Sequence, residues 1–140
     1  RVLPALYLPT PRVELGIALR GIANSAIDIS DGLLADLGHI LDRSQRGAQL
    51  EFAALPTLPV VQAYLHEAVA RDCVLAGGDD YELCFTAPPE RRDAVQAAAE
   101  SAGVAVTRIG RITIPPGLVV LAADGQPLPY AKTGYDHFAA

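Results

Sequence analysis

The sequence has few of the features that bind nucleic acid or span a membrane. It contains 11 lysines and arginines against 16 acidic residues, a net charge of −5, and no basic run. A nucleic-acid surface needs clustered basic side chains to neutralise phosphates, so this balance argues against nucleic acid as a partner. No apolar run approaches the ~20 residues of a membrane-spanning helix. We therefore expect a globular protein without a membrane segment, in which any phosphate ligand relies on metal or backbone groups.

Cysteine and methionine are also scarce. Cys73 and Cys84 are the only cysteines, and their spacing fits neither a metal site nor a disulfide framework. We expect both to be reduced thiols in the core of a cytoplasmic protein. Methionine is absent even from position 1, which leads us to expect a piece excised from a longer polypeptide with a further domain upstream.

Apolar periodicity and chain breakers predict one α+β domain over residues 11–140. Residues 1–10 are interrupted by prolines and are typical of a linker from a missing N-terminal domain. Helices are expected over 11–23, 31–43 and 59–70, with another that begins at Pro88 and ends at Gly103. Strands are expected over 24–29, 48–55 and 81–87, and two or three more follow. Because consecutive strands come late in the chain, we expect a mixed β-sheet covered by helices.

The stretch AIDISDG, residues 26–32, places two acids around a predicted strand end. In one interpretation Ser30 caps the next helix and Asp31 lies in its first turn, near the positive end of the helix dipole. That interpretation leaves Asp28 unexplained, because an acid inside a core strand costs free energy unless it has a partner. In the other, Asp28 and Asp31 bind Mg²⁺ together with substrate phosphates, and Gly32 keeps the backbone open beside the ion. The spacing leaves both interpretations open.

A second acidic turn, GGDDYEL, occupies residues 77–83. Gly77 and Gly78 permit a close backbone approach, and Asp79 and Asp80 then place two negative charges side by side. The turn is either solvated, with its acids satisfying local N–H groups, or half of a shared site for a cation and an anion. Two such turns, each joining apolar segments, make the shared site more plausible than either does alone.

The remaining motifs are weaker. Tyr135, in the tail GYDHF, either packs against Phe138 or covers an aromatic or cationic ligand. The three histidines share no metal-binding spacing, and we expect His39 and His66 to be exposed. Neither a serine nucleophile elbow nor a Walker-type phosphate loop is present.

Three strings together carry a family resemblance. IANSAIDISDGLLADLGHI at 22–40, LAGGDDYELCFT at 75–86 and GYDHF at 134–138 occur in order over nearly the whole chain. The sequence thus resembles the C-terminal half of bacterial thiamine-monophosphate kinases, members of the AIR-synthase-related superfamily with a PurM-like C-terminal domain. The string SDGL is shared with other members of that superfamily, whereas GGDDYEL and GYDHF favour the thiamine enzymes.

The resemblance implies transfer of the γ-phosphoryl group of ATP to thiamine monophosphate, giving thiamine diphosphate, with Mg²⁺ required. By this likeness Asp28 and Asp31 are Mg²⁺ ligands, Ser30 contacts ATP, and Asp79 and Tyr135 face thiamine monophosphate. The family often has glutamate where this sequence has Asp79, so the carboxylate here reaches one methylene less far. Family members are dimers through an N-terminal domain that carries further acids, so we expect a homodimer when intact and an inactive fragment here.

Two alternatives follow from the same residues. Another ATP-using enzyme of the superfamily would share the acidic turns but act on a different substrate. A non-catalytic interaction domain would keep the fold and use the acids only to shape turns.

Overall fold

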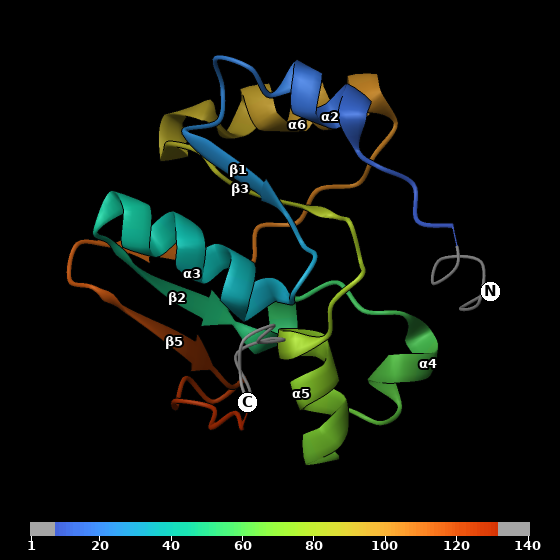
Figure 1. Cartoon of the computed structure of the whole chain (residues 1–140), viewed down its shortest axis with the longest axis vertical. Coiled ribbons are helices and arrows are strands. Elements are labelled where there is room, and N and C mark those ends of the chain that lie inside the picture. Colours follow the sequence, from blue (N-terminus) through green and yellow to red (C-terminus); the bar gives the residue numbers. More distant parts are fainter. Residues whose placement is uncertain (1–7, 132–140) are drawn as a thin grey trace.

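The computed structural model describes residues 8–131, and Tyr135 lies outside them. Over the described residues the elements run, in chain order, α2 (Val13–Ala18), β1 (Ser25–Asp28), α3 (Leu33–Ser44), β2 (Gly47–Glu51), η1 (Phe52–Ala54), α4 (Pro59–Gln62), α5 (Ala68–Ala76), β3 (Leu83–Thr86), η2 (Pro89–Arg91), α6 (Arg92–Ala102), β4 (Gly110–Thr113) and β5 (Gly117–Leu121). Figure 1 shows these elements stacked in layers, with α2 and α6 at one end and the β2–β5 sheet below α3. None of these helices is long and apolar enough to cross a membrane, as far as residues 8–131 are concerned.

The strands form two sheets. β1 and β3 pair as an antiparallel ribbon in which Asp28 lies opposite Leu83. The second sheet has the order β4-β2-β5, with β2 antiparallel to β4 and parallel to β5. This mixture of strand directions with covering helices confirms the predicted α+β class. The structure differs from the expectation in dividing the strands between two sheets rather than one.

The larger core lies between α3 and the three-stranded sheet. The predicted apolar stripe of α3 is confirmed, since Leu33, Leu34, Leu37 and Leu41 are buried, and Ile40 packs against them. Because residues three and four apart share one helix face, this spacing brings the whole stripe onto the sheet. Val120 of β5 and Leu75 of α5 are fully buried in the same cluster. α3 is therefore fixed along its length, and so is the turn that precedes it.

A smaller core joins α2 and α6 to the ribbon. Leu15, Leu19 and Ala98 are buried there, and Leu83 and Phe85 of β3 pack against them. Cys84, between those two residues in sequence, belongs to the larger core. Because successive side chains of a strand point to opposite faces, β3 contributes to both cores. The ribbon is thus held from two sides (Figure 1).

Three predicted element boundaries are wrong. The helix expected over 11–23 ends at Ala18, and Gly21 follows in the left-handed region at φ 75°. The strand expected over 48–55 ends at Glu51, where its pairing with β5 ends. The helix expected over 59–70 is two helices, α4 and α5, separated by residues 63–67. Val60, Tyr64 and Val69 are exposed in this stretch, so no buried face supports one continuous helix.

Other local expectations are confirmed. The helical segment expected after Pro88 begins with η2 and continues as α6, and it stops before Gly103, the C-cap residue with φ 64°. The two histidines expected on the surface, His39 and His66, are exposed. Of the two cysteines, Cys84 is buried as predicted, but Cys73 is exposed, because α5 buries Leu75 instead.

Candidate functional site

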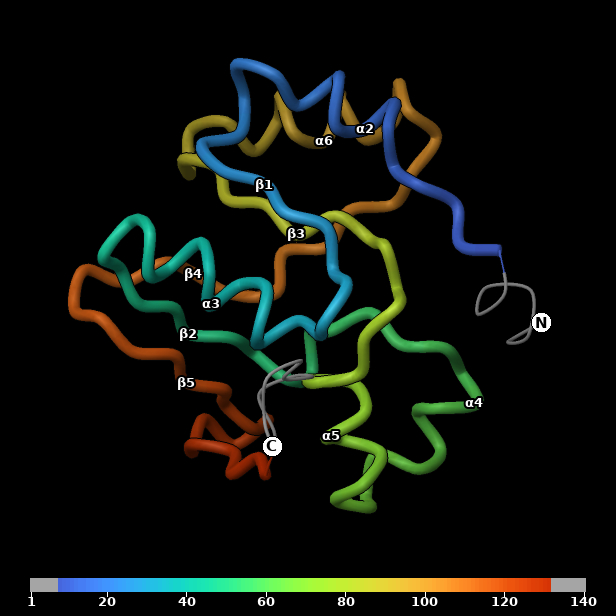
Figure 2. The backbone as a smooth tube through the Cα atoms, in the orientation of Figure 1, coloured from blue at the N-terminus to red at the C-terminus, as the bar shows by residue number. Residues whose placement is uncertain are grey.

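The two acidic turns lie side by side at the end of the β1–β3 ribbon. Backbone hydrogen bonds continue past the strands, from the Ile29 N–H to the Glu82 carbonyl and from the Tyr81 N–H to the Ile29 carbonyl, both at 2.9 Å. The Asp79 N–H then donates to the Ser30 carbonyl at 2.9 Å. Figure 2 shows the chain after β1 running beside the chain before β3. The sequence did not decide whether the two acidic turns meet, and in the structure they are adjacent.

Glycines make this approach possible. A Cβ on Gly78 would fall inside the contact distance of the Ser30 carbonyl oxygen, and one on Gly77 would meet the Cys73 carbonyl oxygen. Gly32 has φ 122°, and a Cβ there would lie 2.8 Å from the backbone of Ala76. Gly78 thus sets the separation of the two turns.

Asp28 is exposed at the last position of β1. The expectation of an acid inside a core strand is therefore wrong, because β1 is one half of a two-stranded ribbon with an open end. Asp28 needs no buried partner, and the desolvation argument for a ligand no longer applies to it. Asp79 and Asp80 are also exposed, and Asp79 has φ 63°, an uncommon conformation for a residue other than glycine.

Tyr81 is hydrogen-bonded to one of these carboxylates. Its hydroxyl donates to Oδ1 of Asp79 at 3.3 Å, and its backbone has φ 50°. The pKa of the Tyr81 phenol is raised, chiefly by the negative charge of Asp79 and by this hydrogen bond, and also by the charges of Asp28 and Asp31. Acids from both turns therefore act on one phenol. Sequence reasoning placed Tyr81 in the motif without assigning it a position in the site.

Glu82 and Asp80 differ in their surroundings. Glu82 forms an ion pair with Arg12, whose Nε and Nη2 donate to its two carboxylate oxygens at 2.9 and 2.6 Å. This pair ties the chain before α2 to the start of β3, and the hydrogen bond to Glu82 raises the pKa of Arg12. Although Asp80 as a residue is exposed, neighbouring groups desolvate its carboxyl, which raises its pKa first, and the charges of Glu82 and Asp79 raise it further.

Sequence reasoning missed Asp36, the one buried charged side chain among residues 8–131, with 3% of its surface exposed. Its Oδ2 accepts hydrogen bonds from the backbone N–H groups of Ser30, Asp31 and Gly32 at 2.9, 3.0 and 3.2 Å. The predicted cap by Ser30 is wrong: the N-cap residue of α3 is Gly32, with no side-chain cap, and Asp36 reaches back to the loop instead. An acid three residues after Leu33, inside an apolar stripe, was the available signal.

The residues that the structure describes include no group of three or more His, Cys, Asp or Glu side chains able to hold a metal ion by themselves. Mg²⁺ commonly takes one or two protein carboxylates and completes its shell with water or substrate phosphate oxygens.

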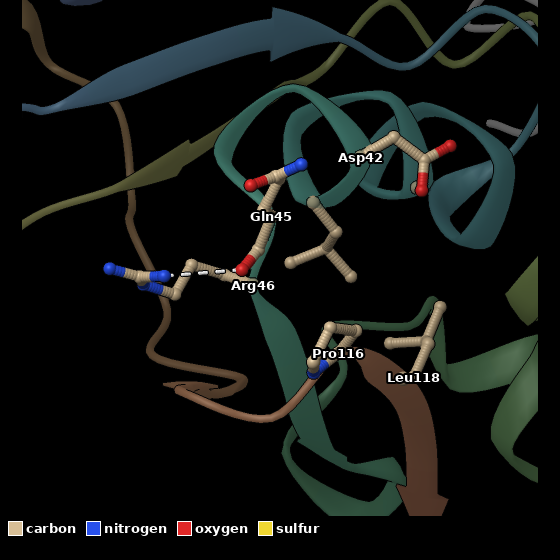
Figure 3. Close-up of a pocket in the computed structure, with 8 residues that line it drawn as sticks. Asp42, Gln45, Arg46, Pro116 and Leu118 are labelled. Carbon is tan, nitrogen blue, oxygen red and sulfur yellow. Dashed lines mark hydrogen bonds between the residues drawn. The ribbon is translucent and has the colours of Figure 1, made fainter.

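A separate pocket of about 560 Å³ lies at the other end of α3 (Figure 3). Asp42, Gln45 and Arg46 line it together with Pro116 and Leu118, and the Arg46 side chain donates to the Gln45 carbonyl at 3.1 Å. It contains none of the predicted site residues.

The domain that carries this geometry occurs in known proteins. The family model of the AIR synthase related protein, C-terminal domain, matches residues 6–122. The chain belongs to this family. As an AIR synthase related C-terminal domain it contains both acidic turns within the matched region, whereas Tyr135 lies beyond it.

Thiamine-monophosphate kinases are among its relatives. The enzyme of Escherichia coli K12 is 44% identical over 131 residues, which are 94% of this chain and 40% of the relative. A crystal structure of the kinase from Stenotrophomonas maltophilia K279a is 50% identical, with a TM-score of 0.78, over 89% of this chain and 39% of that one. A structure of AaThiL complexed with AMPPCP and TMP is 30% identical, with a TM-score of 0.73, over 97% and 40%. The chain thus spans about 40% of the length of these relatives.

Proposed function

We propose that this domain is the C-terminal part of a thiamine-monophosphate kinase, which transfers the γ-phosphoryl group of ATP to thiamine monophosphate and gives thiamine diphosphate. The observation that carries the proposal is the meeting of the Ser30 and Asp79 turns at one end of the ribbon. Phosphoryl transfer asks a protein mainly to position two anions and to neutralise developing charge, and an acidic domain can do so through a bound cation. The kinase relatives and the AaThiL complex support the choice of substrates.

Mg²⁺ fits the residues of the site. Asp28 and Asp31 offer hard carboxylate oxygens on one turn, and Asp79 faces the same phenol from the other. We assign Asp28 and Asp31 to Mg²⁺, which when bound supplies positive charge to the phosphates.

The other assignments concern the substrates. Ser30 would contact ATP from the loop that Asp36 holds, and Asp79 and Tyr135 would face thiamine monophosphate. Asp80 and the glycines at 77 and 78 would shape the second turn and its approach to Gly32.

The proposal also concerns what lies outside the chain. The relatives are about two and a half times as long as the match, which supports a missing N-terminal domain as partner. We propose that this domain completes the metal site, that the intact protein is a homodimer in the cytoplasm, and that the 140-residue chain alone does not catalyse.

A turnover assay tests the function directly. An intact protein of the relatives' length that carries this chain should form thiamine diphosphate from thiamine monophosphate and Mg²⁺·ATP, and Asp31→Asn should abolish this. Turnover of an aminoimidazole ribonucleotide precursor instead would favour another ATP-using member of the family. Mg²⁺·ATP binding that Asp28→Asn and Asp31→Asn leave unchanged would favour an interaction domain.

A further inference from the structure

The loop between β1 and α3 depends on one buried carboxylate. Asp36 lies one turn into α3, 3% exposed, and its Oδ2 accepts three backbone N–H groups in succession, from residues 30, 31 and 32. Hydrogen bonds to a charged acceptor are roughly twice as strong as neutral ones. A single oxygen with three donors therefore fixes the path of the loop more firmly than a side-chain cap with one donor would.

Neighbouring groups leave the loop little freedom. Gly32 is held at φ 122° against the backbone of Ala76, and the Asp36 N–H donates to the Gly32 carbonyl at 3.0 Å. Cys84 of β3 lies close enough for the Asp36 charge to contribute to the raised pKa of its thiol. The carboxylate is thus packed between α3, the loop and the ribbon.

The loop in turn positions the second acidic turn. The Ser30 carbonyl accepts the Asp79 N–H at 2.9 Å, and the N–H group of the same Ser30 donates to Asp36. Any shift of Ser30 is passed to Asp79. A substitution at Asp36 therefore reaches acids on both turns, although its side chain touches neither Asp28 nor Asp79.

We infer that Asp36 is a positioning residue that aligns the carboxylates of the two turns for Mg²⁺ and phosphate. The inference rests on the proposed kinase function, because it concerns the same site. Residues that orient metal ligands without contacting the metal typically change metal affinity by about 10- to 100-fold when substituted.

The test compares Asp36→Asn with Val120→Ala in the intact protein. Val120, in β5 of the three-stranded sheet, is 1% exposed, so its truncation destabilises the core without touching the loop between β1 and α3. Asp36→Asn should weaken Mg²⁺·AMPPCP binding about 10-fold or more, measured by calorimetry, and raise the Mg²⁺ concentration for half-maximal turnover to the same extent. Val120→Ala should leave both within about twofold of wild type.

Amide hydrogen exchange supplies the structural readout. In Asp36→Asn the amides of residues 30–32 should exchange faster, while those of β2 keep their wild-type rates. Should Asp36→Asn not fold, Asp36→Glu keeps the charge, displaces the oxygen by one methylene and carries the same expectation.

The outcomes separate the inference from the proposed function. If wild type phosphorylates thiamine monophosphate and Asp36→Asn matches Val120→Ala in Mg²⁺ dependence, Asp36 is structural only and the inference fails. If wild type lacks this turnover, the proposed function fails. The calorimetric comparison still decides whether Asp36 aligns a metal site.

Discussion

Substituting Gly78 by alanine should separate the two acidic turns. Gly78 has no positive φ, so alanine is not strained by the backbone, and the effect comes from the added methyl group alone. Its Cβ would fall well inside the contact distance of the Ser30 carbonyl oxygen and 3.4 Å from the Asp31 carbonyl carbon. To restore an ordinary C···O separation of about 3.3–3.6 Å, the turns must move apart by on the order of 1 Å.

The magnitude has two parts. Overpacking of this kind costs about 1–3 kcal/mol, and weakening the Asp79–Ser30 hydrogen bond adds about 1 kcal/mol. For function, a displacement of about 1 Å at a catalytic site can cost about 100-fold in rate. Gly78→Ala should therefore lose about 2–4 kcal/mol in urea unfolding. In the intact protein it should turn over about 100-fold more slowly.

Gly16→Ala is the matched control. Gly16 lies within α2 with nothing within 4 Å of an added Cβ, so alanine there should stabilise by about 0.5–1 kcal/mol through helix propensity. If Gly78→Ala is as stable and as active as Gly16→Ala, the close approach of the turns does not exist in solution and the reasoning is refuted.

Two further predictions concern neighbouring groups. Burial, and then the charge of Asp36, raise the pKa of the Cys84 thiol to about 11. The thiol therefore ionises at a lower pH in the unfolded chain than in the folded one. Its contribution to the free energy of unfolding is complete below pH ~8.5, and about 3 kcal/mol is lost as the pH rises towards 11. Urea unfolding should show a steeper alkaline decline for wild type than for Cys84→Ala, and equal slopes would contradict the burial of Cys84. Glu82→Gln should lower the free energy of unfolding by no more than about 1 kcal/mol, because the ion pair with Arg12 is partly exposed. The difference in thermal midpoint from wild type should vanish in 0.5 M salt. A loss of stability that salt does not reduce would show a different role for Glu82.

The sequence predicted those parts of the fold that a strong local periodicity determines, and not those that depend on distant contacts. The stripe of α3 is complete within one helical segment, so its burial could be predicted from Leu33 to Leu41. The split of 59–70 into α4 and α5 could not, because it depends on which of Val60, Tyr64 and Val69 find a surface to pack on. The division into two sheets depends on pairing between residues 55 to 70 positions apart, which a local pattern does not encode.

For the site, the acid-bearing motifs were found and their supports were not. Asp31 and Asp79 stand out as acids beside glycines and Asp28 as an acid in an apolar run, whereas Asp36 is inconspicuous until its three N–H partners are seen. The burial assigned to Asp28 was wrong because a strand of a two-stranded ribbon resembles a core strand in sequence. Tyr135 stays a prediction, outside residues 8–131.

The central claim is that acids on two separate turns face a common point, and the ionisation of Tyr81 measures this in the chain itself. Ultraviolet titration, with Tyr81→Phe as the difference reference, isolates this phenol from the other four tyrosines. Asp79→Asn and Asp28→Asn should each lower its pKa, the first by more, because Asp79 supplies both charge and hydrogen bond. Asp124→Asn, in the turn after β5, should leave it unchanged. A Tyr81 pKa that falls with Asp79→Asn but is identical to wild type in Asp28→Asn would mean that the two turns do not converge.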